Sequence, residues 1–513
     1  MSGRLDKPVV FRSFPGGVNT AMPADNLPAV VSPHGLNSVL VEVSGAEAIP
    51  ARRLGFQPVT DTAPSAGVPI IKLVPYTWIS STGASTSYLL ALSGLGPTSR
   101  LDTIVGSTIE SIATSAFADT EAIPVVTCAQ NVAFFCNGTD RKKVLRLADD
   151  TLAIQDWGLE PPAAPTVTHP ASGEMADGVY QIALTTHNHN SGAASSLGTI
   201  ATVTIALNDE LVVDWSGLTL DAQVTHVRTH LIKETLTSQF FQASESPVAD
   251  GHVHLDLTSA EINQLTILSP TASSAQRPPE NILGSAWHLS RMFVIDNTTL
   301  YWSAVNEPEA YTRVSLPINP KDGQKNVAIV SVHESLLLIL KEGSFWGLFG
   351  ITPQVWELRC INPTIGCRFP HSVQVFEGKV AWWSEHGPVV WDQQGPDVLH
   401  IGKELLGALV DTPTISASYP VLSLIDTSQR LIWWFATEEG HSTPNVIFPY
   451  HARLGCWVSH RWEPMSISAC CATTTSPSLI YVASPMGRLY QYGGHLDGAR
   501  AGYTVTGTVT SFT

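Results

Sequence analysis

Five stretches of the chain share one pattern, in which an apolar strand reaches a short polar turn and a second strand rich in Trp, Tyr or Phe follows. They are 283–303, 329–349, 372–391, 421–435 and 479–492, with turns at Asp296-Asn297, Glu342-Gly343, Glu377-Gly378, Asp426 to Ser428 and Met486-Gly487. The copies recur irregularly at a mean step of roughly 45 to 50 residues, the spacing of radially repeated β-sheets. Because each such sheet is too small to bury its own apolar face, neighbouring sheets must cover one another. The pattern therefore predicts a β-propeller-like architecture.

The composition agrees with an all-β protein of more than one domain. A chain of 513 residues is too long for one ordinary core. Charged residues make up only 14%, hydrophobic residues 44%, and Gly and Pro are plentiful at 38 and 35. Sparse charge with many turn residues is typical of all-β proteins, including those that bury surface in an assembly.

Residues 1–158 are predicted to form an N-terminal arm and the early propeller blades. The arm contains a Gly-Gly turn at residues 14–19, where glycine permits a positive φ. Strand-like stretches follow at 70–79, 88–92, 101–105, 125–136 and 145–157.

Residues 159–271 have a different pattern of strands and turns from the repeated stretches. They predict an inserted β-sandwich of the fibronectin or immunoglobulin-like kind. The segment opens with a proline-rich hinge at 159–165 and continues with strand candidates at 178–186, 200–207, 211–214, 224–233, 237–243 and 252–257. Between residues 161 and 270 there are eleven acidic residues against Arg228 and Lys233, a net charge of −9. We expect this acidic module to face outward or toward a partner.

Residues 272–513 are predicted to supply the remaining blades and a C-terminal strand. The Thr/Val-rich stretch 503–510 suits either an outer strand or a closing strand paired with the first blade. Helix signals are confined to 259–265 and 403–410.

The net charge and the cysteine content argue against some classes of function and of site. A net charge of −16 argues against tight DNA binding, which depends on Lys and Arg contacts to phosphates. Seven cysteines, an odd number without a C-x-x-C pair, favour buried thiols and a reducing compartment during folding over disulfides or a zinc site. The first eight residues lack the apolar stretch of a signal peptide, and no apolar run has the length of a membrane span.

The sequence offers no candidate motif for catalysis or metal binding. The sequence has no P-loop and no G-x-S-x-G elbow. The triplet His187-Asn188-His189 spells a nuclease motif, but that fold needs a ββα-metal unit around it, and here a loop at 190–192 is expected to follow. His226 and His230 lie in an alternating, β-branched run, and we expect them, like His252 and His254, to be exposed strand residues rather than metal ligands. We predict no catalytic residue, no cofactor and no metal site.

Two further residue groups favour structural roles. The carboxylates of Glu438 and Glu439 precede a glycine and indicate a solvated turn rather than an acid/base pair. The pairs Trp382-Trp383 and Trp433-Trp434 could stack on sugars, but neighbouring strand residues face opposite sides of a sheet, so packing in the core and between blades is favoured.

The order of several landmarks resembles the tail nozzle or hub proteins of short-tailed bacteriophages. The opening FPGGVNT at 14–20, GLN at 35–37 and RLGF at 53–56 resemble the start of such chains. The stretch LYWSAVNEPEAY at 300–311 resembles their blade segment in which an aromatic strand ends in Ser and runs into a Pro-Glu turn. YHARLGCW at 450–457 and GRLY at 487–490 resemble later blades, although His451 stands where Asp is expected.

The resemblance implies a structural virion protein rather than an enzyme. Such a protein forms a hexameric ring in the phage tail, is made in the host cytoplasm, docks adaptor proteins and tail fibres or spikes, closes the tail channel and lets genome DNA pass. Two alternatives stay open: a carbohydrate-binding or depolymerising propeller acting on the host cell surface, which would need paired carboxylates at a pocket, and a propeller-based interaction scaffold.

Overall fold

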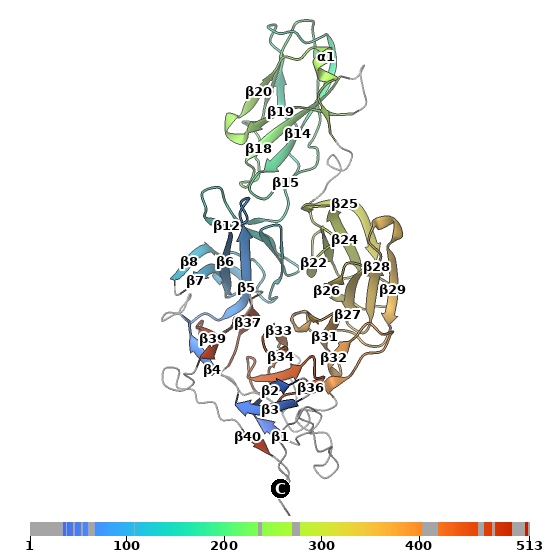
Figure 1. Ribbon diagram of the computed structural model, residues 1–513. Coiled ribbons are helices and arrows are strands. Elements are labelled where there is room, and N and C mark those ends of the chain that lie inside the picture. Colours follow the sequence, from blue (N-terminus) through green and yellow to red (C-terminus); the bar gives the residue numbers. More distant parts are fainter. Residues whose placement is uncertain are drawn as a thin grey trace, which may run out of the picture. The chain divides into compact units, whose positions relative to one another are not determined.

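The computed structural model describes residues 34–36, 38–44, 47–52, 55–59, 67–106, 108–233, 239–268, 277–402, 419–459, 466–473, 478–494 and 508–510 (Figure 1). The chain divides into two compact units, one made of Met1–Val125 and Gln324–Thr513, the other of Val126–Gly323. Both are built from small antiparallel sheets. The prediction of an all-β, propeller-like repeat with an inserted sandwich is confirmed, whereas the domain boundaries at 158 and 271 stay a prediction.

The first unit contains five small sheets of three or four strands. Their strands are β5 (Ile70–Ile79), β6 (Ser85–Ser93), β7 (Arg100–Val105) and β8 (Thr108–Thr114); β26 (Asn326–His333), β27 (Leu336–Lys341), β28 (Phe345–Phe349) and β29 (Glu357–Asn362); β30 (Gln374–Phe376), β31 (Lys379–Ser384) and β32 (Gly387–Trp391); β33 (Leu422–Asp426), β34 (Leu431–Ala436), β35 (Val446–His451) and β36 (Cys456–Trp457); and β37 (Ala469–Ala472), β38 (Ile480–Ala483), β39 (Leu489–Gly494) and β4 (Gly55–Pro58). The turns predicted between paired strands in this unit lie between β27 and β28, β30 and β31, β33 and β34, and β38 and β39.

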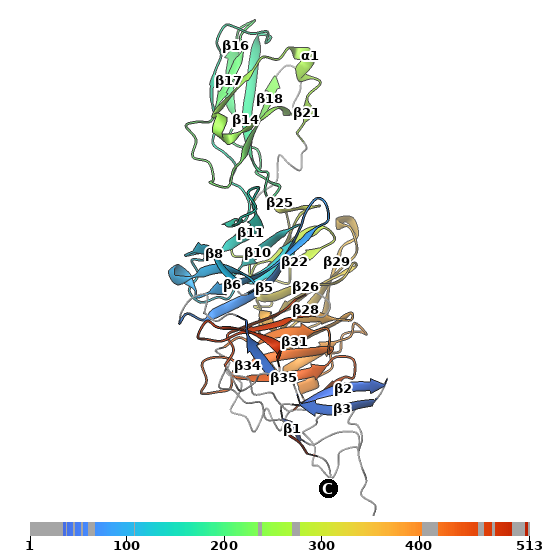
Figure 2. The ribbon, with the colours of Figure 1, turned by 60° about the vertical axis from the view of Figure 1, so that its left-hand side comes forward.

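Strand β4 shows how the start of the chain joins its end. It pairs antiparallel with β39, the last strand of the fifth sheet, and Phe56 packs on Tyr492 with ring centroids 5.4 Å apart. Of the stretch 503–510, for which an outer or a closing strand was predicted, the structure describes β40 (Thr508–Thr510), which pairs antiparallel with β1 (His34–Leu36) in a separate two-stranded sheet. These three residues therefore do not close a blade. A separate two-stranded ribbon is formed by β2 (Ser38–Ser44) and β3 (Glu47–Arg52) (Figure 2).

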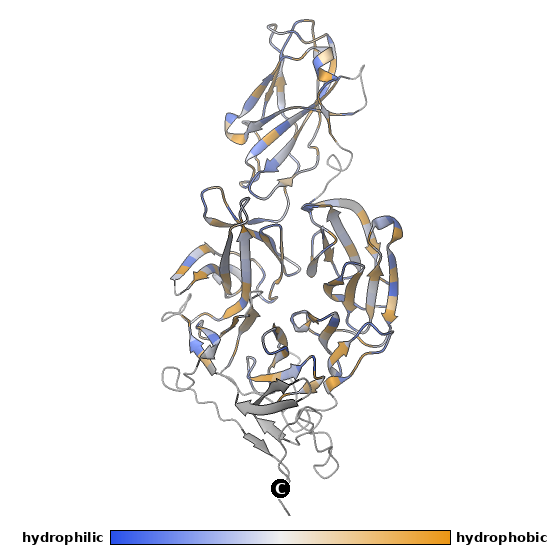
Figure 3. Ribbon diagram, viewed as in Figure 1, coloured by the Kyte–Doolittle hydropathy of each residue, from blue (hydrophilic) through white to orange (hydrophobic). Residues whose placement is uncertain are grey.

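Aromatic side chains hold successive sheets of this unit together, and Figure 3 shows apolar stretches along their strands. Trp382 packs edge-on against Phe345 of the preceding sheet, whereas the adjacent Trp383 packs against Trp434 of the following one. Trp433 points to the opposite side of its own sheet, where its ring lies 4.8 Å from that of Tyr492. Neighbouring strand residues face opposite sides, so each Trp pair joins its sheet to two neighbours. The prediction of a core role for these pairs is confirmed.

The second unit contains two further four-stranded sheets and the sandwich. The sheets comprise β9 (Val125–Ala129), β10 (Val132–Cys136), β11 (Arg141–Arg146) and β12 (Leu152–Asp156), and β22 (Gly284–His288), β23 (Arg291–Ile295), β24 (Thr299–Ala304) and β25 (Glu307–Pro317). The hydroxyl of Thr127 donates to the carbonyl of Ser285 at 2.9 Å, which links the two sheets. Like four of the five sheets of the first unit, each is a meander of strands consecutive in sequence.

The sandwich lies in sequence between β12 and β22 and packs two sheets around its own core. One sheet contains β13 (Thr166–Thr168), β17 (Leu211–Asp214) and β20 (His252–Leu255); the other contains β14 (Gly178–Asn188), β15 (Ala193–Ala194), β16 (Ala201–Ile205), β18 (His226–Lys233), β19 (Phe241–Pro247) and β21 (Thr266–Ile267). Leu184, Val213 and Leu231 lie fully buried between them.

Helices are short throughout the described residues. The helix α1 (Ser259–Ile262) is shorter than the predicted 259–265, and it begins with a capping box between Thr258 and Glu261. The 3-10 turns are η2 (Gly96–Thr98), η3 (Val248–Asp250), η4 (Pro353–Val355) and η5 (Pro370–Ser372). The predicted helix at 403–410 lies outside the described residues.

Candidate functional site

A pocket of about 260 Å³ lies in the second unit, between the sandwich and the β24–β25 turn. We call it the junction pocket. Its sandwich wall comes from β14, β18 and the Ser191–Ser195 segment, and its opposite wall comes from Gln130 and the Asn306–Ala310 segment.

The pairing of β14 with β18 places four polar side chains on the pocket wall. Thr185 lies opposite Arg228, and His187 and His230 occupy the next positions of the same face. The alternating residues Leu184 and Leu231 point the other way, into the sandwich core. The apolar side chains of this sheet thus pack into the sandwich core, and its polar side chains lie on the outer face, toward the pocket.

A single hydroxyl joins the two pocket histidines. Thr185 Oγ1 lies 3.0 Å from His187 Nε2 and 2.9 Å from His230 Nε2. Because a hydroxyl has one proton, it donates to one imidazole and accepts from the other. Burial, with a further contribution from the Arg228 charge, lowers the pKa of His187 to about 3 and that of His230 to about 4. Both rings are therefore neutral at neutral pH.

A buried ion pair lies beside these histidines. Lys143 Nζ is 2.6 Å from Glu309 Oε2, and the side chains are 0% and 3% exposed. The Gly158 amide donates to the same carboxylate oxygen at 2.7 Å, and Lys143 also donates to the Ser191 hydroxyl at 3.1 Å. The pair and its hydrogen bonds thus connect four parts of the second unit: β11, Gly158 just before the proline-rich hinge, the sandwich at Ser191, and β25.

Two buried polar atoms of the pocket residues have no hydrogen-bond partner among the described residues. They are Glu309 Oε1 and His230 Nδ1. Both residues line the pocket, and His230 is only 1% exposed. A buried polar atom without a partner costs free energy, and because neither atom is accessible to solvent, both lie behind the pocket surface and not on it.

Arg228 and Glu307 are the exposed or half-buried charged residues that line the junction pocket, and Arg228 is already paired. Arg228 Nε donates to Glu245 Oε2 at 3.0 Å, and His189 Nε2 lies 2.6 Å from Glu245 Oε1. The His189 ring stacks on that of His226 at a centroid separation of 3.7 Å. The negative charge of Glu245 therefore balances the positive charge of Arg228 within the protein itself.

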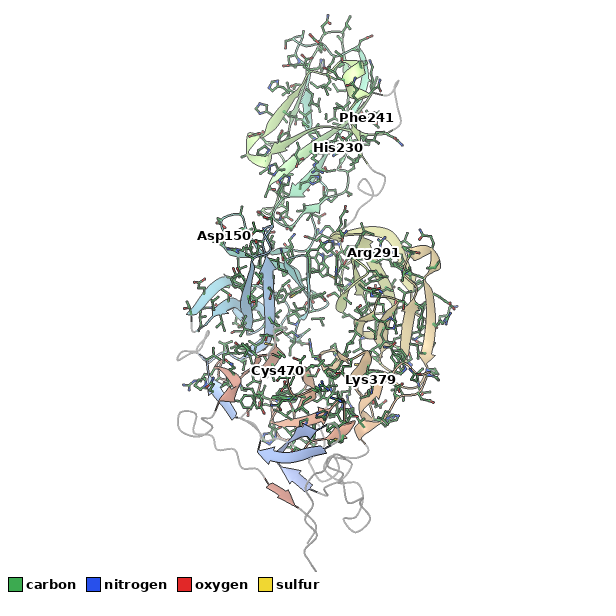
Figure 4. The ribbon with its side chains drawn as sticks, viewed as in Figure 1. Asp150, His230, Phe241, Arg291, Lys379 and Cys470 are labelled. Atoms are coloured by element: carbon green, nitrogen blue, oxygen red, sulfur yellow. The ribbon has the colours of Figure 1, made fainter. Side chains whose placement is uncertain are left out.

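A second pocket, of about 360 Å³, lies in the first unit between the sheets of β31 and β34. We call it the interblade pocket. Its floor is apolar, with Ala381 and Ile432 buried. Its rim carries four exposed charged residues: Lys379, Asp392, Asp397 and Arg453. His230 of the junction pocket and Lys379 of the interblade pocket are labelled in Figure 4.

His187 and Asn188 are the last residues of β14, and a turn follows at 189–192, which includes the predicted loop at 190–192. The structure corrects one expectation about histidines. His230 is on a strand as predicted, but it is buried rather than exposed, because the Asn306–Ala310 segment, distant in sequence, faces it across the junction pocket. The prediction of exposed strand positions holds for His252 and His254.

Other sequence expectations concern carboxylates and metals. Glu439 lies in a turn and is exposed, as predicted, whereas Glu438 is half-buried and accepts a hydrogen bond from the Asn445 amide at 2.7 Å. No group of three or more His, Cys, Asp or Glu side chains in the described part of the chain could hold a metal ion. No helix in these same residues is long and apolar enough to cross a membrane.

Sequence reasoning missed the Lys143–Glu309 pair. A signal was present in β11, where Lys143 shares a strand face with Leu145, a residue only 1% exposed. A lysine among buried apolar residues indicates a buried partner. The sequence does not reveal that Glu309, 166 residues later, is that partner.

Comparisons with known proteins give no family for this chain. No family of proteins matches the sequence, and no curated protein matches it. A solved structure described as the extracellular domain of a hybrid two component system of B. thetaiotaomicron shares 8% identity with a TM-score of 0.29. The alignment covers 85% of this chain and 39% of that one, so the chain spans well under half of that neighbour's length.

Proposed function

We propose that the protein is a structural component of a bacteriophage virion, a tail nozzle or hub. In this role it forms a homo-hexameric ring in the tail, closes the tail channel, docks adaptor proteins and fibres or spikes, and lets DNA pass on ejection. The proposal rests on the ordered sequence landmarks together with the all-β repeat architecture.

One observation carries the proposal furthest. The landmark segment 300–311 contains Glu309, whose buried pair with Lys143 joins β25 to β11, and Lys143 also donates to the Ser191 hydroxyl of the sandwich at 3.1 Å. The neighbouring Pro308 carbonyl accepts a hydrogen bond from the Trp157 indole at 3.3 Å. The segment that carries the resemblance thus joins the two blade-like sheets of the second unit, and through Lys143 it also connects to the sandwich. Firmly joined sheets suit a part that must bear load in an assembly.

The charge distribution supports a passive role toward DNA. The net charge is −16 for the chain, and −9 of it belongs to residues 161–270. Acidic walls repel phosphates and leave no site at which DNA would be held. We propose that the acidic sandwich faces outward or toward a partner with basic surface, and that the protein is not an enzyme.

Reconstitution tests this proposal. Tail particles that lack the protein are mixed with the purified chain, and binding is measured by sedimentation. The proposal predicts that the chain binds these particles and improves their retention of DNA. Particles that carry the adaptor but never bind the chain would contradict it.

A second candidate function is the binding or depolymerisation of carbohydrate at the host surface, favoured by the interblade pocket. Two carboxylates, Asp392 and Asp397, line this pocket, and two-carboxylate sites are typical of glycoside hydrolysis. The D392N and D397N variants separate the two functions. Loss of polysaccharide cleavage in both would support the enzyme, whereas the nozzle proposal predicts no cleavage by the wild type.

A further inference from the structure

We propose that His252 and His254, on the outer face of the sandwich, bind a divalent transition-metal ion of the Zn²⁺ type. The proposal does not depend on the nozzle assignment, because it concerns one face of the sandwich and not the assembly. It adds a ligand role to two histidines that the sequence indicated only as exposed strand residues. It rests on the geometry of the two rings, on the carboxylate that orients one of them, and on the surrounding charge.

Alternation along β20 puts both imidazoles on the solvent side of the sandwich. His252 and His254 are exposed, whereas Val253 and Leu255 pack on the core. The neighbouring strand β17 places Asp214 directly opposite His252. The two histidines therefore lie side by side on an accessible surface, where an ion can reach them from water.

The two rings are spaced as two ligands of one ion are. Their centroids lie 5.3 Å apart and their planes cross at 74°. A zinc–nitrogen bond is about 2.0–2.1 Å long, so two imidazoles on one tetrahedral zinc ion have centroids about 5 Å apart. A ring nitrogen binds a metal through a lone pair in the ring plane, so the ion must lie in both planes at once. Planes that cross at a steep angle meet this condition.

A second pair of neighbouring histidines in the sandwich does not meet it. His189 and His226 stack with centroids 3.7 Å apart and planes only 10° from parallel. Nearly parallel planes at this separation share no point near the rings, so the two rings cannot bind one ion together. His189 is also held by Glu245, at 2.6 Å. This pair therefore serves as the matched control.

A carboxylate prepares His254 to act as a ligand. His254 Nδ1 lies 3.2 Å from Glu210 Oε1. Because a carboxylate can only accept a hydrogen bond, Nδ1 carries the proton and Nε2 keeps the lone pair that binds a metal. Metal-binding histidines commonly donate their other N–H to a carboxylate, which fixes the ring and raises its basicity. Glu210 is therefore a positioning residue for His254.

The chemistry of the pair selects the class of ion. Imidazole nitrogens suit Zn²⁺, Ni²⁺ and Cu²⁺, whereas Mg²⁺ and Ca²⁺ prefer oxygen ligands. The net charge of −9 between residues 161 and 270 attracts cations to this module. Two protein ligands leave the other coordination positions to water. The bound ion thus keeps open positions, at which a group of another molecule can bind.

Isothermal titration calorimetry tests the proposal with the full-length protein, treated with EDTA and then freed of it, and zinc chloride as the probe. We expect Zn²⁺ to bind and an excess of magnesium chloride not to displace it. H252A and H254A should each weaken binding by about tenfold or more, because only one protein ligand remains. No binding of Zn²⁺, or its displacement by Mg²⁺, would overturn the proposal.

Further variants locate the ion. H226A, in the stacked pair, should leave Zn²⁺ affinity unchanged. E210A should weaken it about tenfold, and E210Q should recover part of that loss because its amide oxygen still accepts from Nδ1. Unchanged melting temperatures in EDTA establish that each variant is folded. Zn²⁺ binding that H252A and H254A both leave intact, or that H226A abolishes, would overturn the assignment to this pair.

Discussion

Removing the charge of Lys143 should loosen the junction of β11, β25 and the chain at Gly158, where it enters the sandwich. Lys143 is 0% exposed and lies 2.6 Å from Glu309, so K143M leaves a buried carboxylate without its cation. Breaking a buried pair by removing one partner costs about 3–5 kcal/mol. The adjacent Lys142 provides the control, because its 2.6 Å pair with Asp156 is exposed by 28% and 52%, and such pairs contribute about 0–1 kcal/mol.

The Gly158 amide reports the effect locally, because it donates to Glu309 at 2.7 Å. Hydrogen exchange followed by mass spectrometry measures the free energy of opening there. A loss of about 3 kcal/mol accelerates exchange roughly 10²-fold, since about 1.4 kcal/mol corresponds to a factor of ten. K142M should change exchange by less than about tenfold.

A double variant completes the test. K143M/E309Q removes both charges while the glutamine oxygen still accepts from the Gly158 amide. We expect it to recover most of the stability lost in K143M, because no uncompensated buried charge remains. If K143M exchanges at Gly158 as slowly as K142M, the pair does not hold the junction and the reasoning is refuted.

Two further predictions concern acid stability and backbone packing. His187 and His230 have folded-state pKa values of about 3 and about 4, below the unfolded value near 6.5, so the stability they contribute is present above pH 6.5 and is lost as the pH falls toward 4. By pH 5 the loss is on the order of 2 kcal/mol for each, and H230Q should lessen the drop in melting temperature between pH 7 and 5; an equal drop would contradict the assignment. G366A should strongly destabilise the fold, because its Cβ would lie 2.2 Å from the Glu342 carbonyl oxygen, whereas G217A meets no atom within 4 Å and should be tolerated. Equal melting temperatures for these two variants would be inconsistent with the packing described.

Much of the repeat architecture is predictable from sequence because turns and aromatic strands mark it directly. The predicted strand 70–79 matches β5, and the turn at Asp296-Asn297 joins β23 to β24. Outer strands were harder to predict. β8 and β29 have largely exposed side chains and lack the apolar alternation that identifies a strand. The stretch 125–136, expected as one strand, is two, because Gln130 and Asn131 adopt positive φ in a turn.

The candidate site was far less predictable. Alternation along β18 places His226 and His230 on one face but does not say what covers that face. The cover comes from Asn306–Ala310, which only the tertiary structure brings to the pocket. Lys143 and Glu309 are likewise distant in sequence, and charge pairing over such separations leaves no local pattern.

The native mass of the purified full-length protein tests the central proposal most directly. Light scattering coupled to gel filtration measures it without reference to shape. The nozzle proposal predicts about six copies of the 55.1 kDa chain, either alone or on adding its adaptor. A strict monomer that ignores the adaptor and cleaves surface polysaccharide would contradict the account and favour the enzyme.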